Sequence, residues 1–510
     1  MSRSKHQREA NCKRRIGRRL RRRNWPDQPE PMFKASNIHY EWSDRVRGLA
    51  AGGLGAIHLM VRRIGLIDAI DEKLALLKKH LPYHESDHVL NIAYNILAGG
   101  TCLEDLELRR NDEAYLDALG AVSIPDPTTA GDFCRRFREP KVEVLMDVIN
   151  QTRLRVWKKQ PASFFEEAIL EADGTIAPTT GECKEGMDIS YDGTWGYHPL
   201  LVSLANTAEP LYLINRSGNR PSHEGAAARF DQAIALCREA GFRRILLRGD
   251  TAFSSTKYLD EWDRQGVRFV FGIDAMPKLV GLAEALPAGR WSRLGRPVKH
   301  PVRTGPRERP ERVKERIVRE REFENIHLRS EDVAFFPYQP GACQQAYRIV
   351  VVRKNLTVEK GELAIFDDIR YFFYITNDWA TSSDDLVLLA NQRCNQENLI
   401  DQLKNGVHAM RMPVDNLVSN WAYMVMASLA WTLKAWFALL LPEGGRWSEK
   451  HGMEKQTVLR MEFKRFVSTM LWMPVQIVRA GGRIVYRLLS WNPWQQVFLR
   501  AVDNLRTLRC

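Results

Sequence analysis

A change in hydrophobic periodicity near residue 165 constrains the fold of this chain more than any other feature. From about residue 40 to 160, apolar residues recur at the three- and four-residue spacing of amphipathic helices. Beyond residue 165, short apolar runs bounded by turn residues are typical of buried strands. Elements alternate there in the order β-β-β-α-β-α-β, with strands predicted at 168–173, 197–205, 210–215, 244–250 and 267–272. This order predicts an α/β fold.

A second strand pattern, at 371–377, follows about a hundred residues of different character, rich in Pro, Gly and Arg and with β-like runs. We therefore expect an insertion that divides one α/β core. The predicted regions are a disordered basic arm at 1–35, a helical N-terminal DNA-binding domain at 36–160, the first part of the core at 161–274, a β-rich insertion at 275–370, the second part of the core at 371–441, and a C-terminal region with helices and a hairpin at 442–510.

Positive charge is concentrated in two segments of the chain. The formal net charge is +13, yet residues 1–23 contain eleven Lys and Arg against the single acid Glu9. A second run, 296–321, contains ten Lys and Arg against four Glu. Such local charge predicts a polyanionic partner that binds at defined places. Arg135, Arg136 and Arg138 could contact DNA too, or form an ordinary exposed face.

The cysteines and the apolar runs indicate the compartment. Eight cysteines lie at wide spacings that match neither a zinc motif nor a disulfide framework, which favours a reducing cytoplasm. The N-terminus carries charge without a following apolar stretch, so we expect no secretory signal. Residues 421–441 are long enough to span a bilayer, but they include Ser428, Thr432 and Lys434. We predict a buried helix of a soluble core and no membrane association.

Three acids occupy distinctive places in this pattern: Asp173 ends the first strand, Asp250 ends the fourth, and Glu397 lies on the helix after the last. If the first and fourth strands are neighbours, the three carboxylates form one pocket. Carboxylates placed together in this way favour divalent cations between them, and two Mg²⁺ ions suit in-line attack on a phosphodiester. Arg393 and Lys404 fall within roughly 40° of Glu397 around an ideal helix, where cations could hold phosphate oxygens. An ordinary solvated stripe of ion pairs is the other interpretation of that spacing.

Three motifs together resemble a known family. Glu171-Ala-Asp-Gly-Thr, Arg248-Gly-Asp-Thr-Ala-Phe and Arg393-x3-Glu397-x6-Lys404 are similar to the catalytic motifs of DDE transposases of bacterial insertion sequences, most nearly insertion-sequence family 1380. The segments Arg220-Pro-Ser-His-Glu-Gly and Tyr374-Ile-Thr-Asn are similar too. The resemblance covers roughly residues 50 to 500. In that group the last motif begins with Tyr, whereas this chain has Ala390, which affects a DNA contact and no metal ligand.

The resemblance implies a ribonuclease-H-like catalytic core with a β insertion before the last catalytic helix. It implies that Asp173, Asp250 and Glu397 are catalytic and bind two Mg²⁺ ions, with Mn²⁺ as a substitute, and that Arg393 and Lys404 bind DNA. The expected partners are double-stranded DNA, as element ends and as target, and a second copy of the chain on DNA. The expected location is the bacterial cytoplasm, at the nucleoid. A nuclease of the same fold that cuts without joining, and a non-catalytic DNA-binding protein, are the alternatives.

Overall fold

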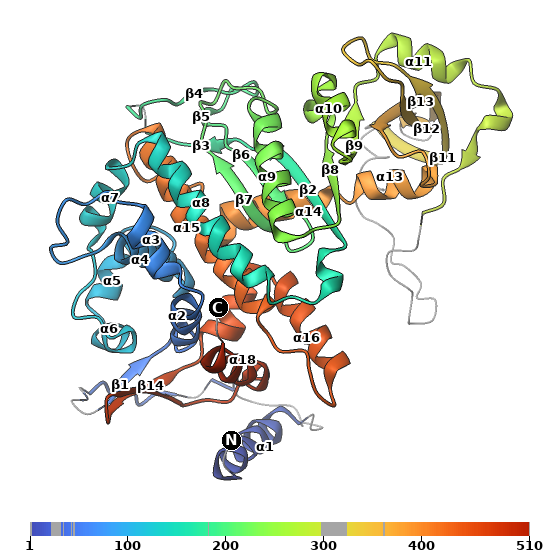
Figure 1. Ribbon diagram of the computed structural model, residues 1–510. Helices are drawn as coiled ribbons and strands as arrows, with labels where there is room; N and C mark the ends of the chain where they lie inside the picture. Colours follow the sequence, from blue (N-terminus) through green and yellow to red (C-terminus); the bar gives the residue numbers. More distant parts are fainter. Residues whose placement is uncertain are drawn as a thin grey trace. The chain divides into compact units, whose positions relative to one another are not determined.

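The computed structural model describes residues 3–21, 32–33, 35–41, 43, 46–181, 183–296, 324–360 and 363–508 (Figure 1). The chain forms two compact units. The first unit combines Met1–Lys159 with Gln402–Cys510, and the second unit consists of Gln160–Asp401. Most of the second basic run, from residue 297 to 321, lies outside the described residues.

The second unit is built on a mixed sheet whose described strands follow the order β10-β11-β12-β13-β9-β8-β2-β6-β7. Its strands are β2 (Glu167–Gly174), β6 (Leu200–Leu204), β7 (Glu209–Ile214), β8 (Arg244–Gly249), β9 (Arg268–Ile273), β10 (Ser292–Arg293), β11 (Glu324–Tyr338), β12 (Tyr347–Lys360) and β13 (Leu363–Thr376). The fold is therefore α/β, and the predicted strands at 168–173, 197–205, 210–215, 244–250 and 267–272 are present in this sheet as β2, β6, β7, β8 and β9. A small sheet of β3 (Ala177–Pro178), β5 (Trp195–Tyr197) and β4 (Asp188–Ile189) was not predicted, because strands of two or three residues carry no periodicity.

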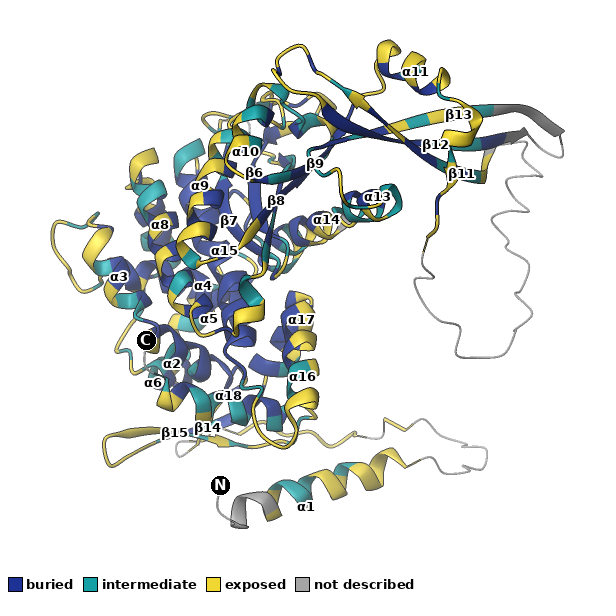
Figure 2. Ribbon diagram, turned by 45° about the vertical axis from the view of Figure 1, so that its right-hand side comes forward, coloured by how far each residue is buried: buried dark blue, intermediate teal, exposed yellow. Residues whose placement is uncertain are grey.

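Helices cover both faces of this sheet. On one face, Phe230 of α9 (Ala226–Ala240) contacts Phe271 of β9, with ring centroids 6.2 Å apart. On the other, Ala390 of α13 (Ser383–Asn391) packs against Val270. Successive residues of a strand point to opposite faces, so α9 and α13 lie on opposite sides of β9. The strands between them are buried, as the dark blue ribbons of Figure 2 show. The remaining helical segments of the unit are η1 (Ala162–Phe165), η2 (Thr251–Phe253), η3 (Thr256–Tyr258), α10 (Leu259–Arg264), α11 (Pro277–Glu284), η4 (Ala288–Arg290) and α14 (Cys394–Asp401).

The predicted insertion is β-rich, but it is not a separate sheet. Its long antiparallel strands β11, β12 and β13 continue the core sheet, because the last residues of β13 pair with β9 from Phe373↔Ile273 to Thr376↔Val270. The strand predicted to begin at residue 371 is the final part of β13, which begins at Leu363. Asn377 then fixes the beginning of β9, because its Oδ1 accepts the N–H of Phe269 at 3.0 Å.

The first unit is organised around α15 (Leu417–Leu439), which packs against helices from both ends of the chain. This helix is long and apolar enough to cross a membrane, yet its most apolar stretch is completely buried within the structure. The prediction of a buried core helix is confirmed. Its assignment to the second part of the core, 371–441, is wrong: residues 402–441 group with the helices. The physical reason is that its apolar surface faces α4 (Glu85–Leu97) and α8 (Glu139–Trp157).

The other elements of the first unit are α2 (Leu54–Arg63), α3 (Leu66–Lys73), α5 (Leu106–Arg110), α6 (Glu113–Leu119), α7 (Pro127–Arg135), η5 (Gln402–Gly406), α16 (Ser448–Arg460), α17 (Phe463–Phe466), η6 (Val467–Leu471) and α18 (Gln495–Thr507). The predicted hairpin is present as β14 (Val475–Ala480) and β15 (Arg483–Leu488), and β1 (Arg47–Leu49) pairs with it. Arg135 forms ion pairs with Asp132 and Asp415 at 2.9 and 3.1 Å, which favours the ordinary exposed face for that arginine.

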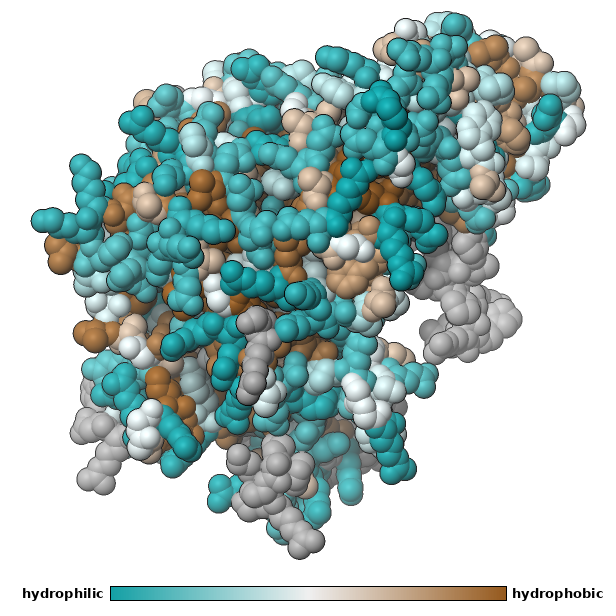
Figure 3. All heavy atoms as spheres, viewed as in Figure 1, coloured by the Kyte–Doolittle hydropathy of each residue, from teal (hydrophilic) through white to brown (hydrophobic). Residues whose placement is uncertain are grey.

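The basic arm differs from the prediction of disorder. Arg3–Leu20 form helix α1, since arginine and lysine are good helix formers and charge density alone does not prevent helix formation. Glu9 accepts a hydrogen bond from the side chain of Gln496 on α18. Residues 22–31 of the arm lie outside the described residues. In Figure 3 the visible surface is mostly hydrophilic, with hydrophobic residues scattered over it.

Lys434 is completely buried in α15, where its Nζ donates to the carbonyl oxygen of Leu459 at 2.6 Å and lies 4.0 Å from the ring centre of Trp431. Burial lowers the pKa of Lys434 from 10.5 to about 7. At pH values between about 7 and 10.5, Lys434 is protonated in the unfolded chain and neutral in the folded chain. Stability therefore rises with pH across that window, and the cost of the buried charge is fully present below it.

We expect Lys434→Met to stabilise the protein at pH 6 and to lose this advantage as pH rises. The difference in unfolding free energy between wild type and variant should change by up to about 1.4 kcal/mol per pH unit above pH 7. Urea unfolding of both proteins from pH 6 to 9 measures it. A difference that does not vary with pH would show that Lys434 stays charged in the folded protein.

Candidate active site

The two aspartates lie at neighbouring strand ends of the second unit. Strands β2 and β8 are parallel neighbours, with Glu171 opposite Arg248 in the register. Asp173 and Asp250 each follow two residues later, so both lie on the face that carries α13, at the carboxyl ends of their strands. Asp250 also begins the turn η2, because its Oδ1 accepts the N–H of Ala252 at 2.9 Å. The first and fourth predicted strands are therefore neighbours, which was the condition for the three carboxylates to form one pocket.

The segment predicted as one helix, 391–404, consists of three pieces. Helix α13 ends at Asn391, Arg393 lies in the turn that follows, and α14 carries Glu397. From Gln402 the chain forms the π-helical turn η5, with the N–H of Val407 donating to the carbonyl of Gln402 at 2.9 Å. The prediction that a regular helix, with 100° of rotation per residue, continues from Glu397 to Lys404 is therefore wrong.

Arg393 and Glu397 nevertheless meet, as the four-residue spacing predicted, with Arg393 Nη2 lying 3.9 Å from Glu397 Oε1. Lys404 lies in η5, which belongs to the first unit. Its role at the site stays a prediction.

The guanidinium of Arg393 lies among the three predicted carboxylates. Its Nη1 is 3.5 Å from Asp173 Oδ2 and 3.5 Å from Asp250 Oδ2, while Nη2 faces Glu397. One cation thus bridges acids that come from β2, from the end of β8 and from α14. The structure brings Asp173, Asp250, Arg393 and Glu397 together, and it was the inward position of Arg393 that the sequence did not predict.

The three carboxylates differ in their exposure to solvent. The side chain of Asp173 is 15% exposed, that of Asp250 is 33% exposed, and that of Glu397 is 62% exposed. Burial and the nearby charge of Asp250 raise the pKa of Asp173 to about 7, although Arg393 opposes the shift. The site therefore concentrates negative charge that a single guanidinium does not fully compensate.

A buried ion pair lies behind the two aspartates. Arg248 Nε donates to Glu171 Oε1 at 2.7 Å, and both side chains are only 2% exposed. Arg248 Nη1 also donates to the carbonyl of Leu389 on α13 at 2.7 Å. The pair therefore ties β2, β8 and the helix leading to Arg393 together. Both residues stand two positions before an aspartate, and this shared spacing was the available sign that they occupy the same face.

Gln396 fixes the orientation of α14. Its side chain is buried, with Oε1 accepting the hydroxyl of Ser203 at 2.9 Å and Nε2 donating to the carbonyl of Leu201 at 3.5 Å. Both partners belong to β6, the strand next to β2. Because Gln396 faces the sheet, the next residue, Glu397, is turned toward Arg393 and solvent. Sequence reasoning missed this contact, since a glutamine on a polar helix gives no sign of burial.

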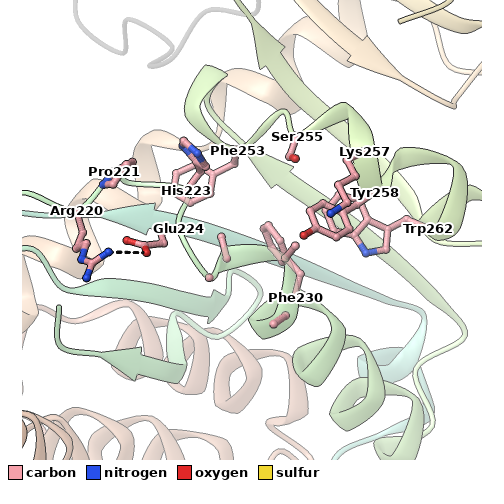
Figure 4. A pocket seen from close by; sticks show the side chains of 14 residues that line it. Arg220, Pro221, His223, Glu224, Phe230, Phe253, Ser255, Lys257, Tyr258 and Trp262 are labelled. Carbon is pink, nitrogen blue, oxygen red and sulfur yellow. Dashed lines mark hydrogen bonds and ion pairs between the residues drawn. The ribbon is translucent and has the colours of Figure 1, made fainter. Parts of the chain in front are cut away.

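A cavity of about 550 Å³ is formed by elements that lead into the site (Figure 4). One wall is the loop from Arg220 to Glu224, where these two side chains pair at 3.1 Å. Half-buried Arg216 holds this loop, since its Nη1 donates to the carbonyls of Pro221, Ser222 and Glu224. The loop packs so closely on β2 that a Cβ on Gly174, the residue after Asp173, would lie 3.0 Å from Ser222 Oγ.

The opposite wall of the cavity begins three residues after Asp250. Phe253 is buried there, and Tyr258 stacks on Trp262 with ring centroids 5.8 Å apart. Exposed Lys257 places its Nζ 5.5 Å from the ring centre of Tyr258. Figure 4 shows Lys257, Tyr258 and Trp262 on the side of the cavity opposite Arg220 and His223. Cations and an aromatic face in one cavity suit a phosphate and a base of nucleic acid.

Within the described residues, no three His, Cys, Asp or Glu side chains stand together in a way that could hold a metal ion. At the predicted site the three acids are arranged around Arg393. The donor set itself is all oxygen, which is the set that hard divalent cations take. Burial and the charge of Asp250 raise the pKa of Asp173, so negative charge at this position is disfavoured unless a cation lies beside it. The residues therefore fit a divalent metal once the guanidinium moves.

Residues 49–510 match the family described as transposase DDE domain, group 1. No curated protein matches the chain. Among solved structures, the chain is similar to the piggyBac transposase in its synaptic complex with hairpin DNA. The identity is 10% and the TM-score is 0.38, over 84% of this chain and 80% of that chain.

Proposed function

The chain belongs to the transposase DDE domain family, and from this premise we propose that it cuts DNA at the terminal inverted repeats of an insertion sequence, most nearly family 1380, and joins the freed 3′ ends to target DNA. One observation carries the proposal: Asp173 and Asp250 at adjacent strand ends and Glu397 on the following helix converge on one cation. The order of strands supports a ribonuclease-H-like core for this chemistry.

Asp173, Asp250 and Glu397 are the residues that would hold Mg²⁺ or Mn²⁺. Bound there, two such ions would activate a water or the 3′-hydroxyl of DNA for attack and would stabilise charge on the leaving oxygen. The chain itself orients the carboxylates: the Glu171–Arg248 pair fixes the two strands, and Gln396 fixes the helix of Glu397. Transposases of the DDE family normally use a divalent metal.

DNA is the proposed partner, bound as element ends and as target by a homodimer in the bacterial cytoplasm. Arg393 and Lys404 are proposed to hold backbone phosphates, Arg393 through its two-pronged guanidinium and Lys404 as a point charge. Ala390, where the resembled motif has Tyr, is buried against the sheet; this difference concerns the positioning of DNA ends and removes no proposed metal ligand.

A strand-transfer assay tests the proposal. Inverted repeats in the DNA that flanks the gene provide the ends, and labelled duplexes with free 3′-hydroxyls are incubated with a plasmid target and Mg²⁺. Joined product is the expected result. Nicking without joined product would identify a nuclease of the same fold, and specific binding without Mg²⁺-dependent nicking would identify a non-catalytic DNA-binding protein.

Deleting residues 1–23 is expected to weaken binding to all duplexes by a similar factor. These residues carry a net charge of +10, and helix α1 presents much of it to solvent. Each lost phosphate contact lowers the slope of log affinity against log salt by about 0.9. Fluorescence anisotropy with element ends and random duplexes measures the slope. An unchanged slope would leave α1 without a role in DNA binding.

Substitutions in the cavity are expected to weaken DNA binding locally. Lys257→Ala should lower affinity for element ends severalfold and reduce the salt slope by about one contact. Tyr258→Ala should weaken binding without altering the salt slope, because a stacked base brings no counterion release. The control is Lys278→Ala on α11, which removes an equal charge outside the cavity lining. Equal losses for Lys257→Ala and this control would remove the cavity from the DNA path.

A further inference from the structure

Arg393 holds the place among the carboxylates that a bound cation would take. Its Nη1 contacts the Oδ2 atoms of both Asp173 and Asp250, so the oxygens that face the centre of the site are already engaged. We propose that Arg393 is an exchangeable counter-cation: it holds the carboxylates together before metal binds, and metal binding releases it to a DNA phosphate. This inference rests on the proposed function, in which these carboxylates bind the metal.

The guanidinium and a metal ion exclude one another at this position. Arginine keeps its charge at any pH at which the protein is folded, so it cannot adapt by losing a proton. A divalent cation bound by Asp173 and Asp250 would compete for the same oxygens and repel the guanidinium at close range. Arg393 must therefore leave the carboxylates when the metal is bound.

The contacts of Arg393 are of the kind that can be exchanged. Strong charge-assisted hydrogen bonds are about 2.7–2.9 Å long, whereas Arg393 lies 3.5 Å from both aspartates and 3.9 Å from Glu397. Buried Arg248, in contrast, bonds Glu171 at 2.7 Å in a fixed arrangement. The two arginines sit on the same face of one sheet, and only Arg393 has long contacts and a solvent-exposed partner.

The backbone around Arg393 lets the side chain move alone. Arg393 lies in the turn between α13 and α14, and its N–H is held by the carbonyl of Ala390 at 3.2 Å. Gln396 anchors α14 to β6 independently. Glu397 therefore keeps its place while the long, partly exposed arginine side chain rotates outward, toward the side from which DNA must reach the carboxylates.

This exchange makes Arg393 compete with the metal, and it couples the binding of metal to the binding of DNA. Without DNA, Arg393 lowers the affinity of the site for metal, because each binding event must displace it. With DNA, the displaced guanidinium gains a phosphate, so DNA and metal each raise the affinity for the other. The arrangement therefore favours metal binding, and with it cleavage, in molecules that hold DNA.

Calorimetric titration of the full chain with Mn²⁺ in the absence of DNA tests whether Arg393 competes with the metal for the carboxylates. Arg393→Gln should bind Mn²⁺ roughly tenfold more tightly than wild type, a difference of about 1.4 kcal/mol. Arg393→Lys, which keeps the charge, should lie between them. The matched control is Arg243→Gln, which removes a charge from an exposed pair with Glu166 in the same unit and should leave Mn²⁺ affinity unchanged.

Thermal unfolding supplies a readout that a merely structural role would not produce. Arg393→Gln should melt below wild type in chelator, and the difference should disappear in saturating Mg²⁺, where Arg393 no longer holds the carboxylates. With element-end duplex and Ca²⁺, wild type should gain more DNA affinity from the cation than Arg393→Gln does. A melting deficit of equal size with and without metal would overturn the exchange.

Asp250→Asn separates failure of this inference from failure of the proposed function. If Asp250→Asn loses Mn²⁺ binding while Arg393→Gln binds no more tightly than wild type, the metal site stands and the counter-cation role is wrong. If Asp250→Asn binds Mn²⁺ as wild type does, the carboxylates are not the metal site, and the proposed function loses its basis.

Discussion

Asp173→Asn, Asp250→Asn and Glu397→Gln are each expected to reduce Mg²⁺-dependent DNA cleavage by several orders of magnitude while element ends remain bound. Loss of a ligand from a two-metal site removes the stabilisation of charge in the transition state. Each amide keeps the shape of the acid. Measured without divalent metal, binding of ends should change little or improve, since a negative charge is removed near the phosphate and the cations proposed to hold DNA remain.

Cleavage of labelled ends under single-turnover conditions, with affinity measured on the same preparations, decides this prediction. Glu261→Gln is the control, because Glu261 is an acid of the same unit that pairs with Arg264 on α10, outside the carboxylate cluster. Near wild-type cleavage by any one of the three variants would remove that residue from the site. A loss of cleavage in Glu261→Gln would mean that the assay reports folding.

Breaking the buried pair between Arg248 and Glu171 is expected to destabilise the protein by about 3–5 kcal/mol, because Arg248→Met leaves a carboxylate buried without its partner. The carbonyl of Leu389 would lose its donor as well. The double replacement Arg248→Met with Glu171→Leu should recover most of the loss, since an apolar pair needs no compensation. Urea unfolding of the wild type, the single variant and the double variant measures these differences in unfolding free energy.

An exposed pair provides the comparison for that prediction. Arg243 and Glu166 lie 2.8 Å apart on the surface of the same unit, and Arg243→Met should cost less than about 1 kcal/mol. Equal costs for the buried and exposed substitutions would contradict the assigned burial. If the double variant were as unstable as the single one, Arg248 would stabilise the fold mainly through α13 and little through Glu171.

The sequence predicted the parts of this fold that depend on local pattern. The order of elements along the chain followed from periodicity, and so did the placement of Asp173 and Asp250 at strand ends, because each acid closes a buried apolar run. That the two ends are neighbours depends on the pairing of β2 with β8. The four-residue spacing of Arg393 and Glu397 survived the break before α14, since a single turn of helix is enough to bring them together. The catalytic roles of these residues remain predictions.

The features that could not be predicted depend on contacts distant in sequence. Nothing local shows that residues after Gln402 leave the sheet, since that depends on α15 packing against α4 and α8. The π-helical turn at η5 follows from an irregular hydrogen bond that composition does not record. The inward position of Arg393 needs both aspartates, which lie more than a hundred residues away in the chain.

The outermost strand β7 has a consequence for how copies of this chain can associate. An edge strand invites pairing with another chain when its outer side is open, whereas most residues of β7 are buried. Pro210, the second residue of β7, lacks an N–H, and the pairing of β7 with β6 shifts register between Val202 and Ser203. Both features discourage a further strand from adding at that edge. Self-association by sheet extension is therefore disfavoured at β7.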